Sequence, residues 1–213
     1  MRVLFTRPNH DDTTHYLYYW SAKTIEFAKK KGFTVLDLKG DRANKVEVSS
    51  ILSKKKPSFV VFNGHGSSEN IFGYKNEPIL SADDVVLLKD KIVYAITCKS
   101  AKELGRKSVS SGTKSFIGYE DDFIFFYEPN MMTRPLQDKT ARIFLEPAYR
   151  IVFSLLKGHS TRSAWKKSQE LFKEYLEKLL VSGRDEDIVL ARYLWWDMKN
   201  QVCLGDDFIP TQF

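Results

Sequence analysis

The sequence predicts an α/β protein, a three-layer sandwich in which a mostly parallel six-stranded sheet is flanked by helices. Two observations predict this class. Apolar runs of four to eight residues alternate with longer segments of helical periodicity, and this spacing is typical of βαβ units. Several runs are apolar at every position, as expected for strands covered on both faces. With 213 residues and no repeat or Gly/Ser linker, the chain is expected to form one domain, residues 1–213.

Five strands and four helices are predicted in the first part of the chain. The strands are the apolar runs Arg2–Phe5, Phe33–Leu38, Phe59–Phe62, Ile92–Thr97 and Ser115–Tyr119. The helical segments between them are Tyr16–Lys31, Lys45–Lys55, Ala82–Leu88 and Ala101–Arg106. Gly32 ends the first helix as a C-cap glycine, and Pro57 follows the second because proline cannot continue a helix.

The second part of the chain is predicted to be more helical. Two long helices are expected, Lys139–Lys157 and Ser160–Val181. Gly158 separates them, and Ser160 or Thr161 can cap the second with its hydroxyl group. The short apolar run Gln201–Leu204 then supplies the sixth strand of the predicted sheet.

The charge balance is weakly basic, with 33 Lys and Arg against 27 Asp and Glu, a net charge of +6. The lysine triplets Lys29–Lys31 and Lys54–Lys56 fall near the ends of predicted helices, where cations complement the helix dipole. We therefore assign this charge to a hydrated surface. Nucleic acid is disfavoured as a partner, since its binding site would gather basic residues on one face with aromatics among them.

The composition also bears on membranes, cell compartment and cofactors. No run approaches 18 uncharged apolar residues, so neither a transmembrane helix nor a membrane partner is expected. The N-terminus lacks the layout of a signal peptide, which predicts a cytoplasmic protein. Cys98 and Cys203 are then expected to stay reduced, with Cys203 structural. The four histidines show no metal-ligand spacing, so no metal and no other cofactor is expected.

A thiol and an imidazole stand at the carboxyl ends of two strands that are predicted to be buried. His65 follows the first in the run FVVFNGHG, and Cys98 ends the run KIVYAITC. In a parallel sheet these ends lie at one edge, where α/β proteins bind ligands. A cysteine nucleophile needs an imidazole to handle protons, so the pair is a candidate catalytic site. Taken alone, each residue is more often structural, as a small buried hydrophobe or a loop histidine.

The chain resembles the caspase-fold cysteine peptidases of clan CD, most closely the CHAT and gingipain-like branch. Five segments carry the resemblance, in the same order along almost the whole chain: VVFNGHG, ILSADDVVLLKDKIVYAITC, SGTKSFIGYEDDF, KGHSTRSAWKKSQELF and YLWWDMKNQVCLGD. The resemblance implies a caspase-like domain and a cysteine endopeptidase with Cys98 as nucleophile and His65 as the proton-handling residue. It also implies an oxyanion hole formed by the N–H groups of Gly66 and Cys98.

Substrate preference follows less directly from the resemblance. Family members commonly build part of the S1 pocket after the strand Ser115–Tyr119, which makes Asp121 and Asp122 candidate substrate-binding residues and implies Lys or Arg at P1. An acidic run after a strand is otherwise usually a solvated loop. Ile96 stands two positions before the cysteine, where metacaspases place an acidic residue and caspases a glutamine, so that position predicts no preference.

The expected function is cleavage of protein or peptide substrates without a cofactor, in a regulated pathway of the defence or cell-death type. A regulatory protein, a small-ligand activator, self-association or cleavage in the predicted exposed loop Glu128–Asp138 would control it. One alternative is a non-catalytic caspase-fold module for signalling or protein interaction. Another is a nucleotide-binding doubly wound protein, which the lack of a glycine-rich phosphate loop disfavours.

Overall fold

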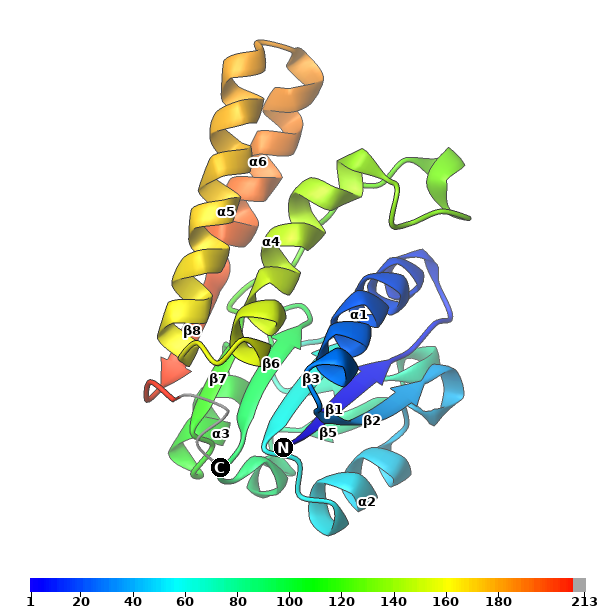
Figure 1. Ribbon diagram of the computed structural model, residues 1–213, viewed down its shortest axis with the longest axis vertical. Helices are drawn as coiled ribbons and strands as arrows, with labels where there is room; N and C mark the ends of the chain where they lie inside the picture. The colour runs from blue at the N-terminus through cyan, green and yellow to red at the C-terminus, as the bar shows by residue number, and fades with distance from the viewer. Residues whose placement is uncertain (209–213) are drawn as a thin grey trace.

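A computed structural model describes residues 1–208 and confirms the predicted α/β class, a six-stranded and mostly parallel sheet between helices (Figure 1). The strands of this sheet are β1 (Arg2–Arg7), β2 (Thr34–Lys39), β3 (Phe59–Asn63), β6 (Ile92–Ile96), β7 (Ser115–Tyr119) and β8 (Gln201–Gly205). Their order is β2-β1-β3-β6-β7-β8, with β8 antiparallel to β7 and the other neighbours parallel. A separate antiparallel hairpin pairs β4 (Asn70–Phe72) with β5 (Pro78–Ser81).

The central strands β3, β6 and β7 are buried at every position, which explains why apolar residues predominate in them. Successive side chains of a strand face opposite sides of the sheet. In β6, Ile92, Tyr94 and Ile96 therefore pack into one core cluster, and Val93 and Ala95 pack into the other. The sheet is thus the middle layer between two hydrophobic cores.

Two pairs of helices cover the two faces of the sheet. Helices α1 (Asp12–Lys30) and α4 (Lys139–Leu156) lie on one face, and α2 (Lys45–Lys54) and α3 (Leu104–Ser110) lie on the other (Figure 1). Asn44 caps α2 and Asp138 caps α4, each with a side-chain oxygen that accepts a backbone N–H of the first turn. These helices hold the ends of the strands at a defined edge.

Helices α5 (Thr161–Ser182) and α6 (Asp185–Asn200) form a hairpin that extends beyond the sheet at the top of Figure 1. The Ser160 side chain caps α5, in agreement with the sequence. Gly183 follows α5 with φ 69°, a left-handed conformation that glycine adopts without steric cost. Strand β8 follows α6 directly and returns the chain to the edge of the sheet beside β7.

Several predicted helices differ from those in the structure. Helix α1 begins at Asp12, before the predicted Tyr16, because the Asp11 side chain caps its first turn. The segment predicted as helix Ala82–Leu88 forms only a 3-10 turn at Val85–Leu88, after the unpredicted β4–β5 hairpin. The short helix expected at Ala101–Arg106 begins three residues later, as α3. Helix α6 was not predicted at all.

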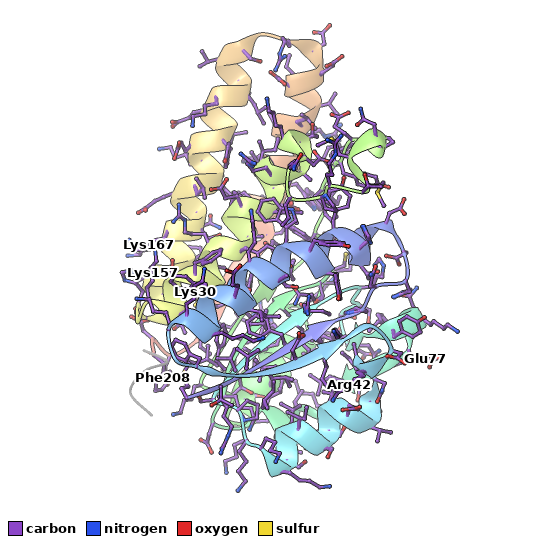
Figure 2. The ribbon with its side chains drawn as sticks, turned by 45° about the vertical axis from the view of Figure 1, so that its right-hand side comes forward. Lys30, Arg42, Glu77, Lys157, Lys167 and Phe208 are labelled. Atoms are coloured by element: carbon purple, nitrogen blue, oxygen red, sulfur yellow. The ribbon has the colours of Figure 1, made fainter. Side chains whose placement is uncertain are left out.

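Charged side chains cover the outside of the helices (Figure 2). The last turn of α1 holds Lys29 and Lys30, and Lys30 forms an ion pair with Glu26 one turn earlier. Lys157 stands just after α4, so cations lie at the carboxyl ends of both helices, as the helix dipole favours. Among the helices of residues 1–208, none combines the length and the apolar character that crossing a membrane requires.

Candidate active site

The strand order places the carboxyl ends of β1, β3 and β6 side by side. Strand β1 pairs with β2 on one side and with β3 on the other, so the sheet grows in opposite directions from β1. In α/β proteins, ligands commonly bind outside the strand ends at such a switch point. The register aligns Asn63 of β3 with Ile96 of β6. The loops that follow the three strands carry Asp11, His65 and Cys98, so these residues come to one edge of the sheet.

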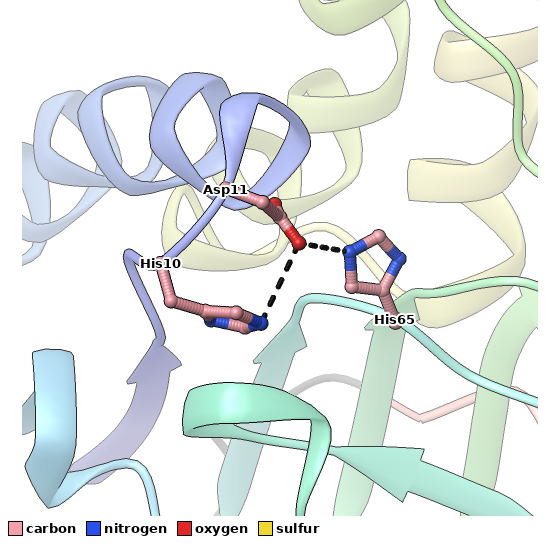
Figure 3. Close-up of side chains that lie close together, drawn as sticks. All are labelled: His10, Asp11 and His65. Carbon is pink, nitrogen blue, oxygen red and sulfur yellow. Dashed lines mark hydrogen bonds and ion pairs between the residues drawn. The ribbon is translucent and has the colours of Figure 1, made fainter.

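His65 forms a hydrogen bond with the Asp11 carboxylate (Figure 3). Its Nε2 atom lies 2.7 Å from Asp11 Oδ2, and about a third of each side chain is exposed, 33% for His65 and 36% for Asp11. An ionised carboxylate only accepts hydrogen bonds, so this partner assigns the imidazole proton to Nε2. The Nδ1 atom then carries the lone pair, and Figure 3 shows it on the side of the ring away from Asp11. His65 is therefore oriented to accept a proton through Nδ1.

The Asp11 carboxylate is held by the first turn of α1. Its Oδ1 atom accepts hydrogen bonds from the Thr14 backbone N–H and from the Thr14 hydroxyl, both at 2.8 Å. Burial raises the pKa of the Asp11 carboxyl, but the hydrogen bonds from Thr14 and His65 outweigh burial and lower the pKa below its ordinary value. The group is therefore ionised at neutral pH, and one carboxylate both caps a helix and orients an imidazole.

The backbone that leads to His65 is fixed by buried contacts. The Asn63 amide donates to the Thr6 carbonyl at 2.8 Å and accepts from the Tyr149 hydroxyl at 2.6 Å. Gly64 has φ 139°, and a Cβ atom there would lie 3.0 Å from a backbone oxygen, so the turn requires glycine. The imidazole thus projects from a rigid strand end.

Gly66 brings the loops after β3 and β6 into contact. A Cβ atom at this position would lie 2.6 Å from the Cys98 carbonyl oxygen and 2.9 Å from Thr97 Cβ, so no larger residue fits. Within residues 1–208, neither the N–H of Gly66 nor that of Cys98 donates to a protein acceptor. Adjacent loops therefore hold two backbone N–H groups without a protein acceptor among the described residues.

The Cys98 thiol contacts the loop that follows β7. Its Sγ atom lies 3.8 Å from the Phe123 carbonyl oxygen, to which the S–H can donate. Burial raises the pKa of the Cys98 thiol to about 11; the Phe123 backbone offsets part of this shift, and the carboxylates of Asp122 and Asp197 add to it. In the part of the chain that the structure describes, no hydrogen bond joins Sγ to His65. The thiol is neutral at physiological pH, so a base must remove its proton during attack.

Both acidic residues that were predicted to bind substrate pair with one lysine. Lys99 Nζ lies 2.9 Å from Asp122 Oδ2 and 3.8 Å from Asp121 Oδ1. Hydrogen bonding and charge from Asp122 raise the pKa of Lys99. Lys99 also has φ 55°, which places the residue after the cysteine in the left-handed region, sparsely populated for non-glycine residues. The loop therefore carries an acidic pair close to Cys98 whose charge Lys99 partly neutralises.

Asp197 is a buried carboxyl group on the other side of this loop. Its Oδ1 atom accepts the Ile124 backbone N–H at 2.9 Å, whereas Oδ2 is buried without a hydrogen-bond partner. Burial raises the pKa of Asp197 well above its ordinary value, and the Ile124 hydrogen bond lowers it only in part. On the adjacent residue of α6, Trp196 Nε1 donates to the Asp122 carbonyl at 3.0 Å. Helix α6 therefore anchors the loop that covers the thiol.

The second cysteine has different surroundings. Cys203 in β8 lies with its Sγ atom 3.7 Å from the hydroxyl of Ser115, the first residue of β7. Burial raises the pKa of the Cys203 thiol, with smaller effects from Ser115 and Arg162. No imidazole is among these contacts.

His10 approaches the same oxygen of the Asp11 carboxylate as His65, from a different direction (Figure 3). Its Nε2 atom lies 3.4 Å from Asp11 Oδ2 and 3.1 Å from Asn76 Oδ1, and its Nδ1 atom is buried and has no hydrogen-bond partner among residues 1–208. The two imidazole nitrogens and the carboxylate oxygen all lie within 4.8 Å of one another. Sequence spacing does not predict this group, because the fold joins residues from two distant loops.

Sequence reasoning singled out His65, Gly66, Cys98 and the acidic pair, but it missed Asp11 and Asp197. The order Asp11-x-x-Thr14 is a helix-capping signal. That signal predicts Asp11 as a helix cap. It does not predict the contact of Asp11 with His65, 54 positions away, because that contact depends on β1 and β3 being neighbours. Asp197 carries no local signal, since burial of a carboxyl group depends on tertiary packing.

Comparison with known proteins yields no match to a family model. No curated protein matches the chain either.

Proposed function

We propose that this protein is a cysteine endopeptidase in which Cys98 is the nucleophile, His65 the general base and acid, and Asp11 the residue that positions His65. One observation carries the proposal. A half-buried thiol and an imidazole oriented by an ionised carboxylate stand at adjacent strand ends, at the edge of an α/β sheet where ligands bind. The caspase-fold resemblance assigns the same two residues from sequence motifs.

The chemistry begins when Cys98 turns from the Phe123 carbonyl toward His65. Nδ1 of His65 takes the thiol proton while sulfur attacks the substrate carbonyl carbon. The oxyanion of the tetrahedral intermediate accepts hydrogen bonds from the N–H groups of Gly66 and Cys98. Collapse breaks the peptide bond, and the His65 imidazolium gives its proton to the leaving amine. Water, deprotonated by His65, then hydrolyses the thioester to a carboxylic acid and the free thiol.

The substrates in this proposal are proteins or peptides with Lys or Arg at P1. The Asp122 carboxylate acts on the Cys98 thiol, so negative charge lies near the place where the scissile bond would lie. A basic P1 side chain would compete with Lys99 for Asp121 and Asp122. We also propose a cytoplasmic location and control by a partner protein or small ligand, as in defence or cell-death pathways.

A second candidate is a non-catalytic module for signalling or protein interaction. One observation favours it: the thiol is neutral and contacts Phe123 rather than His65. The same observation fits a resting peptidase that a partner or substrate rearranges, because catalytic hydrogen bonds in unliganded sites are often long.

The test is cleavage of a peptide library by the wild type, Cys98→Ala and Cys203→Ala. We expect the wild type and Cys203→Ala to cleave, and Cys98→Ala to lose activity on the order of 10³-fold or more with an unchanged circular dichroism spectrum. The same library reports the P1 residue. Cleavage by folded Cys98→Ala at the wild-type rate would remove the proposal.

A further inference from the structure

We propose that His10, Asp11 and His65 form an inhibitory Zn²⁺ site. The ligand atoms are Nε2 of each imidazole and Oδ2 of the carboxylate (Figure 3). The binding half of this proposal stands on geometry alone. The inhibitory half rests on the proposed peptidase function, since it concerns the protonation of His65.

The three ligand atoms lie close enough together for one ion to bind them. In a tetrahedral site with Zn–N and Zn–O bonds of about 2.0–2.2 Å, ligand atoms stand roughly 3.3–3.5 Å apart. Asp11 Oδ2 lies 2.7 Å from His65 Nε2 and 3.4 Å from His10 Nε2, and the three atoms fall within 4.8 Å of one another. Binding would therefore need the three side chains to adjust so that Asp11 Oδ2 and His65 Nε2, now 2.7 Å apart, separate to about 3.3 Å.

The donor set and its exposure favour zinc with one open position. Two imidazoles and a carboxylate are typical of zinc sites that leave the fourth position for water or another ligand. Soft metal ions are disfavoured because no thiolate belongs to the group. Mg²⁺ and Ca²⁺ are disfavoured because they prefer oxygen ligands and two of the three donors here are nitrogen. The His10 side chain is 11% exposed, whereas His65 and Asp11 are 33% and 36% exposed. The ion thus has a rigid ligand on one side and an entry path on the other.

Zinc at this site would stop catalysis through the tautomer of His65. The ion replaces the proton on Nε2, so a neutral imidazole must carry its proton on Nδ1. That nitrogen then has no lone pair to accept the Cys98 proton. Zinc also takes the Asp11 carboxylate away from the imidazole. The thiol, which is neutral at physiological pH, is left without a base.

The surroundings of His10 indicate reversible binding. Ligating histidines usually donate the second ring N–H to an acceptor, and such partners are worth about 10- to 100-fold in metal affinity. His10 Nδ1 is buried without a partner, and Asn76 Oδ1 competes for its Nε2 atom. We therefore expect an ion that is released when zinc is scarce, as regulation requires.

The binding test uses untagged protein, zinc chloride and a competing chromophoric chelator, so it does not depend on peptidase activity. We expect one ion per chain in the wild type and in Cys98→Ala. His10→Phe, which keeps a ring beside Tyr74, should weaken binding by more than about 100-fold, because even an outer partner is worth 10- to 100-fold. His159→Phe is the matched control and should bind like the wild type. A dissociation constant above about 1 mM for the wild type would overturn the site.

A second result would also overturn the site. If zinc binding is lost in Cys98→Ala and kept in His10→Phe, the thiol binds the ion and His10 does not. The inhibitory half is tested by titrating zinc into cleavage assays, each scored against the zinc-free rate of the same variant. We expect inhibition of the wild type and resistance in His10→Phe. Equal inhibition of the wild type and His10→Phe would contradict the proposal that zinc at this site inhibits cleavage. If no zinc-free cleavage is found but one ion binds, the peptidase function fails while the metal site stands.

Discussion

The two oxygens of the Asp11 carboxylate make different contacts. Oδ1 accepts the capping hydrogen bonds of Thr14, and Oδ2 accepts the Nε2 proton of His65. A carboxylate can serve both because each of its oxygens is an acceptor. An amide has only one acceptor, so asparagine at this position cannot keep both contacts. This difference separates the structural role of Asp11 from its positioning role.

Asp11→Asn is therefore expected to keep the fold and lose activity. Asparagine caps helices as well as aspartate does, so the free energy of unfolding should change by less than about 1 kcal/mol. Its Nδ2 group would face His65 and favour the tautomer protonated on Nδ1, which lowers kcat on the order of 10²- to 10⁴-fold. The measurements are kcat and KM separately, with ¹⁵N NMR of His65 reporting the tautomer.

Asp12→Asn is the matched control for this variant. Asp12 is the next residue and accepts the Tyr127 hydroxyl at 2.7 Å, but it makes no contact with His65. It should keep kcat and the His65 tautomer. An Asp11→Asn enzyme within about threefold of the wild-type kcat, a difference below about 0.7 kcal/mol, would show that His65 needs no positioning carboxylate.

At the scale of elements, α6 connects the helical hairpin to the thiol. Asp197 accepts a hydrogen bond from the Ile124 N–H, and Trp196 donates one to the Asp122 carbonyl. Two consecutive residues of α6 therefore fix the loop that contacts Cys98. The Asp197 carboxyl has its pKa raised by burial and its Oδ2 atom unpartnered. A neutral carboxyl group is therefore the form that the folded protein prefers.

This preference predicts how stability depends on pH. The pKa of Asp197 is higher in the folded than in the unfolded protein. The stabilisation that Asp197 gives the folded protein is therefore present below about pH 4, and it is lost as the pH rises through the pKa of the folded protein. Asp197→Asn keeps an Oδ1 acceptor for Ile124 and cannot ionise. Its free energy of unfolding relative to wild type should rise by about 1 kcal/mol or more from pH 4 to pH 8, since one pKa unit is worth about 1.4 kcal/mol.

Urea unfolding at several pH values measures this difference. Asp206→Asn, at an exposed position after β8, controls for the removal of one negative charge. A difference between Asp197→Asn and wild type that stays constant with pH would mean that the buried carboxyl does not change its ionisation on folding.

The elements also explain which parts of the fold can be predicted from sequence. Strands β3, β6 and β7 are mostly apolar because they are covered on both faces, so they are found directly. Helix α6 escapes prediction because its buried face includes two acidic residues, while two of its aliphatic residues face solvent. The buried residues are Asp187, Ala191, Leu194 and Asp197, and the exposed aliphatic ones are Ile188 and Val189.

The candidate site, like the fold, can be predicted only in part from the sequence. His65 and Cys98 are found because each stands at the end of a predicted strand, and parallel strands end at one edge. Asp11 and His10 are not found, because their proximity to His65 requires knowing that β3 lies beside β1. Strand order is a property of the whole sheet and carries no local signal.

At the scale of the whole molecule, one sheet edge gathers residues from three loops. The first 98 residues supply His10, Asp11, His65 and Cys98, while the loop after β7 and helix α6 cover the thiol from the other side. Because the pKa of Cys98 is raised to about 11, the resting protein holds a neutral thiol. Cys98 should therefore react readily only when a bound substrate brings its thiol to His65, and slowly in the unliganded protein.

Covalent labelling by a peptidyl acyloxymethyl ketone with Arg at P1, followed by mass spectrometry, tests directly whether Cys98 is a nucleophile. The predicted result is one adduct per chain, on Cys98, formed faster at neutral pH than the adduct of iodoacetamide and absent in Cys98→Ala. A neutral resting thiol reacts slowly with a simple alkylating agent, whereas the peptide places its electrophile beside the oriented imidazole. Labelling of Cys203 alone, or no adduct on the folded protein, would contradict a nucleophilic Cys98.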